Sequence, residues 1–245
     1  MRNARHLQWA SVLPIGGMAL LLCGCAELQT QPRGPVAFTR EEAPPFSFCV
    51  IGNTRAGTRA WPNDPASPSV YYLEQIGWIN RCEPDFTVNL GDMIAGDRAN
   101  PLRLTAQQWD AFDDTMRSYR QPLYMVAGSR DVWDAASAAL YVERYGQLYY
   151  SWDHKGSHFT VLSAEVPGEE GLIGPAQREW LNRDLVLAAG AQHRFVFVNA
   201  PIWKGTRDGA NAWMRDVQPL LQECRVDAVF AAQNNWYEPD DIGGI

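Results

Sequence analysis

Histidine and positive charge are both in short supply in this chain. Its 245 residues include 4 histidines, and 21 lysines and arginines stand against 28 aspartates and glutamates, for a formal net charge of −7. An acidic body lacks the basic surface that nucleic-acid phosphates require, so we expect no nucleic-acid partner. The apolar run from Trp9 to Leu22 is shorter than the roughly 20 residues of a membrane-spanning helix, which argues against a transmembrane anchor.

The first 24 residues have the features of an export signal. Arg2 and Arg5 supply a positive start, an apolar run follows, and the run ends in the letters LLCGC. This ending resembles the lipobox of bacterial lipoproteins, which implies cleavage before Cys25 and a lipid attached to that residue. Several acyl chains on one residue would anchor the protein stably in a membrane. The same resemblance implies a location for the protein. A residue other than aspartate after the lipidated cysteine, here Ala26, implies the periplasmic face of the outer membrane in bacteria with two membranes. An ordinary secretory signal without lipid remains the alternative.

The rest of the chain has the composition of a tether followed by one domain. Removing residues 1–24 leaves 245 − 24 = 221 residues and removes two arginines, so the formal charge moves from −7 to −9. Residues 25–45 are polar and proline-rich, which is typical of a flexible tether. Residues 46–245 are long enough to bury a core. Cys82 and Cys224 each precede an expected strand, so they either pair in an oxidising compartment or remain thiols.

Apolar segments alternate between strand and helix patterns. Helical spacing of apolar residues predicts helices over about 69–81 and 175–187, and a Thr105/Gln108 capping box predicts the start of another. Short apolar runs rich in β-branched and aromatic residues predict strands at 46–51, 85–90, 122–127, 149–154, 157–165, 194–200 and 227–232. The alternation predicts an α/β layered domain, and a hairpin within it predicts a mixed or second sheet.

Polar clusters follow most of these strands at the point where each strand ends. They occupy residues 52–57, 91–97, 128–131, 199–201 and 232–238. In α/β folds, ligands gather beyond the carboxyl ends of the strands. We therefore expect the clusters to face one another across a single site.

The spacing of the clusters resembles the motifs of the calcineurin-like metallophosphoesterases, over residues 46–238. Each of the family's five motifs has a counterpart here. Asp-x-His corresponds to Asn53-Thr54-Arg55, Gly-Asp to Gly91-Asp92, and Gly-Asn-His-Asp/Glu to Gly128-Ser129-Arg130-Asp131. His-x-Pro corresponds to Asn199-Ala200-Pro201, and Gly-His-x-His to Ala232-Gln233-Asn234-Asn235. The resemblance implies a four-layer α/β/β/α sandwich with mixed sheets, in which the second sheet could be incomplete toward the C-terminus. It also implies a site that holds two divalent metal ions in relatives.

Most of the implied metal-ligand positions carry side chains that are poor metal ligands. Asp92 alone keeps the family's residue. Arg55 has no acceptor and stays charged, so it would repel a cation. The amides at Asn53, Asn199, Gln233 and Asn235 are polar but lack charge and basicity. We therefore expect no metal or other cofactor, with divalent metal ions, or a single weakly held ion beside Asp92, as the alternative.

Arginine also replaces the implied catalytic histidine, at position 130. It does not release its proton near neutral pH, so Arg130 cannot serve as a general acid. Ser129 has no histidine or lysine base beside it in the motif and is a poor candidate nucleophile. We expect Arg55 and Arg130 to pair with Asp92 and Asp131 in place of the missing cations. The alternative is that both guanidinium groups point into solvent.

These observations favour a non-catalytic envelope lipoprotein that uses a phosphoesterase scaffold for binding or scaffolding. Its candidate binding site comprises Asn53, Arg55, Asp92, Ser129, Arg130, Asp131, Asn199, Gln233 and Asn235. Arginines recognise phosphate in two-point fashion, so an anionic or phosphate-bearing ligand is one form of this hypothesis and a self-neutralised pocket is another. The alternative function is hydrolysis of phosphomonoesters or phosphodiesters with an atypical or single-metal site.

Overall fold

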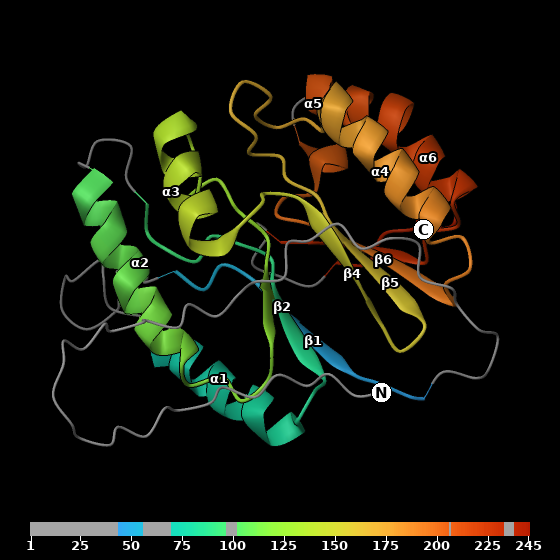
Figure 1. The fold of residues 1–245 in the computed structure, drawn as a ribbon. Helices are drawn as coiled ribbons and strands as arrows, with labels where there is room; N and C mark the ends of the chain where they lie inside the picture. Colours follow the sequence, from blue (N-terminus) through green and yellow to red (C-terminus); the bar gives the residue numbers. More distant parts are fainter. Residues whose placement is uncertain (1–43, 56–69, 97–101, 206, 233–237) are drawn as a thin grey trace, which may run out of the picture.

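The chain folds into four layers, with two sheets face to face and helices on the outside of each (Figure 1). This computed structural model describes residues 44–55, 70–96, 102–205, 207–232 and 238–245. The expected signal, Cys25, most of the tether, and site residues Gln233 and Asn235 lie outside the described residues.

The first sheet is parallel, in the order β1-β2-β3. Its strands are β1 (Phe48–Ile51), β2 (Phe86–Asn89) and β3 (Leu123–Met125). Its outer face is covered by α1 (Val70–Cys82), α2 (Leu102–Met116) and α3 (Ala135–Tyr145). Asp134 caps α3 by accepting a hydrogen bond from the Ser137 N–H at 2.7 Å, so the helix begins where the polar turn after β3 ends.

The second sheet is mixed, in the order β4-β5-β6-β7. Its strands are β4 (Tyr150–His154), β5 (Ser157–Val161), β6 (His193–Val198) and β7 (Ala228–Ala231). The expected hairpin is the antiparallel pair β4-β5, and β5, β6 and β7 are parallel. The helical segments are α4 (Pro175–Leu187), the 3-10 helix η2 (Ile202–Lys204), α5 (Arg207–Ala212), the π-helix η3 (Trp213–Val217) and α6 (Gln218–Glu223).

Aromatic side chains fill the space between the two sheets. Phe86 of β2 and Phe159 of β5 meet edge to face with ring centroids 5.1 Å apart, and Trp152 of β4 stacks on Phe159 at 5.2 Å. Side chains alternate along a strand, so each strand can contribute to this central core and to an outer core beneath the helices. The packed layers hold the strand ends of both sheets at one edge.

The capping box expected at Thr105 and Gln108 is wrong. Helix α2 already includes Leu102, so Thr105 lies inside the helix and is buried. The Gln108 side chain instead accepts a hydrogen bond from the N–H of Gly96 at 3.0 Å. A threonine three residues before a glutamine resembles the capping box at the start of a helix. Here the glutamine side chain instead forms a tertiary hydrogen bond with the loop after β2.

The thiols of Cys82 and Cys224 are too far apart in the layered fold to form a disulfide. Cys82 ends α1 on the outside of the first sheet, whereas Cys224 packs with the helices outside the second sheet. Packed sheets are separated by about 10 Å and a disulfide needs Cα atoms within roughly 7 Å. The cysteines of the described part are all thiols. In the same part of the chain, every helix is too short or too polar to cross a membrane.

Candidate functional site

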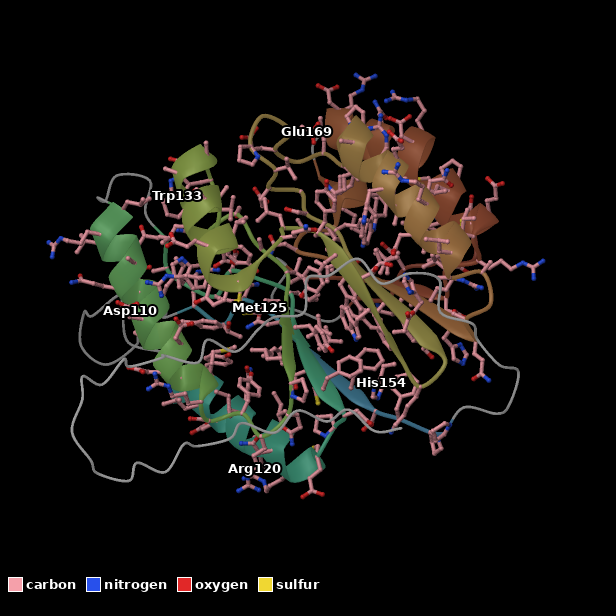
Figure 2. All side chains as sticks on the ribbon, in the orientation of Figure 1. Asp110, Arg120, Met125, Trp133, His154 and Glu169 are labelled. Atoms are coloured by element: carbon pink, nitrogen blue, oxygen red, sulfur yellow. The ribbon has the colours of Figure 1, made fainter. Side chains whose placement is uncertain are left out.

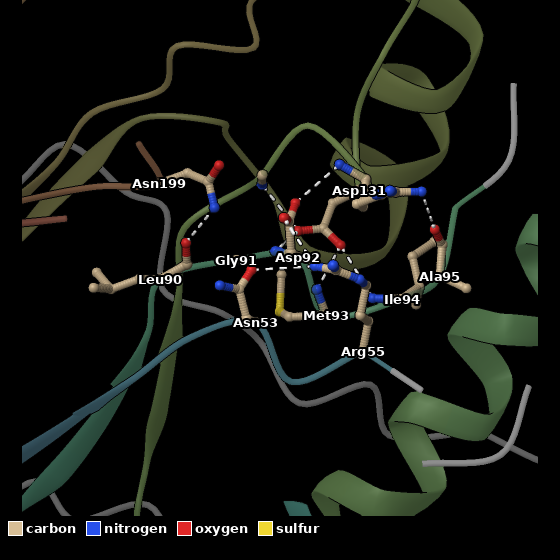
Figure 3. Close-up of polar contacts among 12 residues, drawn as sticks. Asn53, Arg55, Leu90, Gly91, Asp92, Met93, Ile94, Ala95, Asp131 and Asn199 are labelled. Atoms are coloured by element: carbon tan, nitrogen blue, oxygen red, sulfur yellow. Dashed lines mark hydrogen bonds and ion pairs between the residues drawn. The ribbon is translucent and has the colours of Figure 1, made fainter. Parts of the chain in front are cut away.

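The polar clusters that follow β1, β2, β3 and β6 meet at one edge of the sandwich, as the sequence predicts (Figure 3). Parallel strands deliver their carboxyl ends to the same edge. The turns are tied together by backbone hydrogen bonds from Asn53 N to Gly91 O at 3.0 Å and from Arg55 N to Asp92 O at 2.9 Å. The first two turns of the site therefore form one continuous backbone unit.

Asp92 lies at the centre of this unit and is almost fully buried. Its backbone has φ of 54°, in the left-handed region, and follows Gly91 with φ of 94°. Its Oδ2 lies 3.3 Å from Nη1 of Arg55, and its Oδ1 accepts a hydrogen bond from the N–H of Arg130 at 3.0 Å. The Arg55 guanidinium also donates to Oδ1 of Asn53 at 3.2 Å. The expected pairing of Arg55 with Asp92 is thus confirmed.

Asp131 is held by the backbone and not by an arginine. Its carboxylate is fully buried and accepts from the N–H groups of Asp92 at 2.8 Å, Gly128 at 2.9 Å, Met93 at 2.9 Å and Ile94 at 3.2 Å. Burial, followed by the charge of Asp92, raises the pKa of Asp131 to about 7, although these hydrogen bonds act in the opposite direction. Asp131 therefore fixes the turn after β2 against the turn after β3.

The expected pairing of Arg130 with Asp92 or Asp131 through its side chain is wrong. The Arg130 side chain is exposed, and its Nη1 donates to the carbonyl oxygen of Ala95 at 3.3 Å. The tight turn sends the backbone N–H of Arg130 toward Asp92 and its side chain outward. Within the described part of the chain, no carboxylate forms a salt bridge with Arg130.

Asn199 closes the site from the second sheet. It follows β6, is fully buried, and donates from Nδ2 to the carbonyl oxygen of Leu90 at 2.6 Å. Gly91 and Gly128 leave the room that its amide occupies, because a Cβ at either position would lie 2.6–2.7 Å from Nδ2 of Asn199. Among the described residues, none donates a hydrogen bond to the other end of this amide, Oδ1.

Two further residues that support the site, Asn89 and Thr54, were not among the predicted site residues. Asn89, the last residue of β2, donates to Oγ1 of Thr54 at 2.9 Å and accepts from the N–H of Gly91 at 3.1 Å. A polar residue that ends a fully buried strand, directly before a glycine, is the signal that could have identified Asn89. Ser129 is half-buried at the same edge.

The described residues do not fit a pair of divalent metal ions. They contain no group of three or more histidine, cysteine, aspartate or glutamate side chains arranged to hold one. Both Asp92 oxygens already have partners, and four N–H dipoles point at the Asp131 carboxylate and would oppose a cation beside it. Arg55 occupies a motif position that would have to supply a lone pair to a metal ion, and a guanidinium has none to offer.

The three histidines of the described residues are engaged elsewhere in the second sheet. His154 lies 3.1 Å from Asp85, and His193 begins β6, at the opposite end of that strand from Asn199. His158 is buried between Asp153 and Asp184. None of these three rings points to the strand-end site.

Comparison with known proteins relates this fold to phosphatases. No family model matches the sequence. The sequence is 29% identical to purple acid phosphatase 23 of Arabidopsis thaliana over an alignment of 160 residues, and the match covers 56% of this chain and 34% of that protein. The chain thus spans about a third of the length of this relative.

Two solved structures share the arrangement of layers. One is purple acid phosphatase PPD1 from yellow lupin (Lupinus luteus) seeds, with a TM-score of 0.57 and 14% identity over 77% of this chain and 37% of the lupin chain. The other is a dimetal phosphatase from Danio rerio, with a TM-score of 0.55 and 14% identity over 76% of this chain and 79% of the fish chain. The chain therefore has the calcineurin-like phosphoesterase fold that its sequence predicts.

Proposed function

We propose that this chain is a non-catalytic envelope lipoprotein whose phosphoesterase fold binds an anionic ligand at the strand-end site. The observation that carries the proposal is the contact between Arg55 and Asp92, at 3.3 Å. A fixed guanidinium takes the place that a cation would need beside the one retained ligand residue.

The chemistry of the site supports binding over hydrolysis. Without a bound metal, hydrolysis needs another route to an activated water or a nucleophile. Arg55 and Arg130 cannot exchange protons near neutral pH. Asp131 is enclosed by backbone N–H groups and is fully buried, so it has no path to a substrate.

The exposure of the two arginines supports an anionic ligand. The Arg55 side chain is 35% exposed, and its contacts with Asp92 and Asn53 both use Nη1, which leaves other N–H donors of its guanidinium available to a ligand. Arg130 is exposed, and among the described residues its side chain contacts the carbonyl oxygen of Ala95 alone. Guanidinium groups bind oxyanions through paired N–H donors without a metal. The acidic chain as a whole makes a nucleic-acid partner unsuitable.

A metal-loading experiment tests the non-catalytic assignment. Residues 26–245 are incubated with manganese, zinc or iron and then desalted. We expect well under one metal ion per chain by elemental analysis, and no hydrolysis of phosphomonoesters or phosphodiesters above a control without protein. Stoichiometric metal together with turnover that disappears in Asp92→Ala would instead establish a metal-dependent hydrolase.

Membrane anchoring through Cys25 is tested separately. The motif LLCGC supports lipid attachment at this residue. In the native host, Cys25→Ser should abolish fatty-acid labelling and release the protein from the outer-membrane fraction. Persistent membrane association of the substituted chain would contradict the lipid anchor, and it would leave the binding-site proposal unaffected.

A further inference from the structure

Two of the thiols belong to neighbouring elements on the outer face of the first sheet. Cys49 is the second residue of β1, and Cys82 is the last residue of α1, which covers this face. Successive side chains of a strand point to opposite faces. Phe48 and Val50 pack between the two sheets, whereas Ile51 packs beneath the helices. Cys49 therefore points outward, into the layer that α1 occupies.

Hydrogen bonds also join the end of α1 to the start of β1. Three residues after Cys82, Asp85 donates from its N–H to the carbonyl oxygen of Ser47 at 2.8 Å, and its Oδ2 accepts from the N–H of Ser47 at 3.1 Å. Ser47 precedes Cys49 by two residues. The two cysteines thus belong to one corner of the first sheet, at its amino edge, where Arg120 leads into β3 (Figure 2). This edge is opposite the strand-end site.

The thiols of this corner also act on each other electrostatically. Burial, followed by the nearby charge of Cys82, raises the pKa of the Cys49 thiol. Burial raises the pKa of Cys224 as well, but the charges that act on Cys224 are those of Glu223 and Arg194. Cys49 and Cys82 are therefore a pair of neighbouring thiols, and Cys224 lies apart from them.

We propose that Cys49 and Cys82 form a disulfide under oxidising conditions, and that this bond fastens the end of α1 to β1. The inference goes beyond anion binding at the strand-end site, and it draws on the proposed envelope location only for the oxidising setting. Disulfide geometry requires Cα atoms within roughly 7 Å. Because Cys82 is the last residue of its helix, its thiol can reach Cys49 without disturbing the preceding turns of α1.

The exposure of the two thiols suits stepwise exchange with a disulfide oxidant. Cys82 is exposed and Cys49 is half-buried. The Cys82 thiolate attacks one sulfur of the oxidant and releases the other as a thiolate. The Cys49 thiolate then attacks the Cys82 sulfur of this mixed disulfide and releases the second half of the oxidant. The two cysteines lose two electrons and two protons, and the oxidant becomes two thiols.

The bond closes a loop that runs from residue 49 to residue 82 and includes Asn53 and Arg55 of the strand-end site. A disulfide stabilises a fold mainly by restricting the unfolded chain, and the effect grows with the length of the closed loop. For a loop of this length in a domain of this size, we expect the thermal midpoint of the oxidised chain to exceed that of the reduced chain by roughly 5 °C or more.

Oxidation of residues 26–245 with oxidised glutathione tests the pairing. These residues contain every described strand and helix and three cysteines. Free thiols, counted after unfolding, should fall from three to one, and peptide mapping without reductant should show Cys49 linked to Cys82. Three free thiols, glutathione adducts alone, or a link to Cys224 would overturn the proposal. The purified chain and chemical oxidant separate a failure of pairing from a failure of export or of anion binding.

Substitutions then test whether the bond stabilises the fold. In Cys82→Ser the difference in thermal midpoint between oxidised and reduced chains should disappear. Cys224→Ser is the matched control, because it removes the thiol that lies apart, and it should keep both the Cys49–Cys82 link and the full difference in midpoint. A link that forms without raising the midpoint would show that the bond does not fasten α1 to β1.

Discussion

The buried polar groups around His158 in the second sheet form a closed network, whereas the strand-end site leaves part of the Arg55 guanidinium exposed. In the second sheet, His158 lies 2.8 Å from Asp153 through Nδ1 and 2.9 Å from Asp184 through Nε2. The remaining oxygen of Asp184 accepts from Oγ of Ser151 at 2.6 Å, and Thr160 adds a further donor at 3.0 Å. At the strand-end site, by contrast, no residue of the described ranges donates to Oδ1 of Asn199, and the Arg55 side chain is 35% exposed.

The difference separates structural polarity from functional polarity in one molecule. A network whose members satisfy one another fixes β4, β5 and α4 together and leaves nothing for a ligand. A buried donor or acceptor without a hydrogen-bond partner lowers the stability of the fold unless a ligand or water binds to it. Buried charge alone therefore does not mark the functional region of this protein.

The largest effect that we predict concerns Asp131, the fixed point of the site. Asp131→Ala leaves four buried N–H groups without their acceptor, so the free energy of unfolding should fall by roughly 3 kcal/mol or more. Urea denaturation measures the loss. Asp114→Ala is the control, since Asp114 is 70% exposed and its ion pair with Arg117 is on the surface; it should change stability by less than about 0.5 kcal/mol. A similarly small loss in Asp131→Ala would mean that these amides find other partners.

The second prediction concerns the pH dependence of the closed network. Burial alone would lower the pKa of His158, but hydrogen bonds to Asp153 and Asp184, with their charges, raise it from 6.5 to about 9. Because the folded pKa is above the unfolded one, the stabilisation is fully present below pH 6.5 and is lost as pH rises through 9. The shift corresponds to roughly 3 kcal/mol.

Denaturation midpoints of the unsubstituted chain and of His158→Gln, compared at pH 6.5 and pH 9.5, isolate this contribution. The stability difference between the two chains should be large at the lower pH and should shrink by most of its value at the higher pH. A difference that does not change with pH would show that the pKa of His158 is not raised in the folded protein.

The third prediction is smaller and concerns the pair at the centre of the site. Arg55 is 35% exposed, so solvent screens its attraction for Asp92 and the coupling should be about 1 kcal/mol or less. A double-mutant cycle with Arg55→Gln and Asp92→Asn measures that coupling energy. Complete additivity of the two substitutions would indicate that the guanidinium does not stabilise Asp92 in solution, and would remove the main support for the non-catalytic proposal.

The sequence alone predicts the layers and the site edge well, because both depend on local patterns. Apolar runs and their polar ends place Asp92 and Asn199 at one edge, and opposite charge leads Arg55 to Asp92. Side-chain direction within a turn is a different matter. The position of Arg130 in its motif does not reveal that its N–H faces Asp92 while its guanidinium faces Ala95. Nor does any pattern show that Asn199 Oδ1 has no donor among the residues that the structure describes, since that depends on packing between two sheets.

The smallest effect on stability is expected at Arg130, and it sharpens the contrast between the two regions most directly. Arg130→Ala removes an exposed side chain with one 3.3 Å contact to a carbonyl oxygen, while the backbone N–H that holds Asp92 stays in place. The free energy of unfolding should therefore change by less than about 0.5 kcal/mol. Anion affinity should nevertheless weaken severalfold, for phosphate and sulfate alike, because the lost interaction is a charge and not a proton acceptor. This weakening should diminish in high salt, which screens an exposed guanidinium. If Arg130→Ala were to destabilise the fold strongly, Arg130 would belong with His158 among the structural groups, and Arg55 would be left as the cation that the ligand meets.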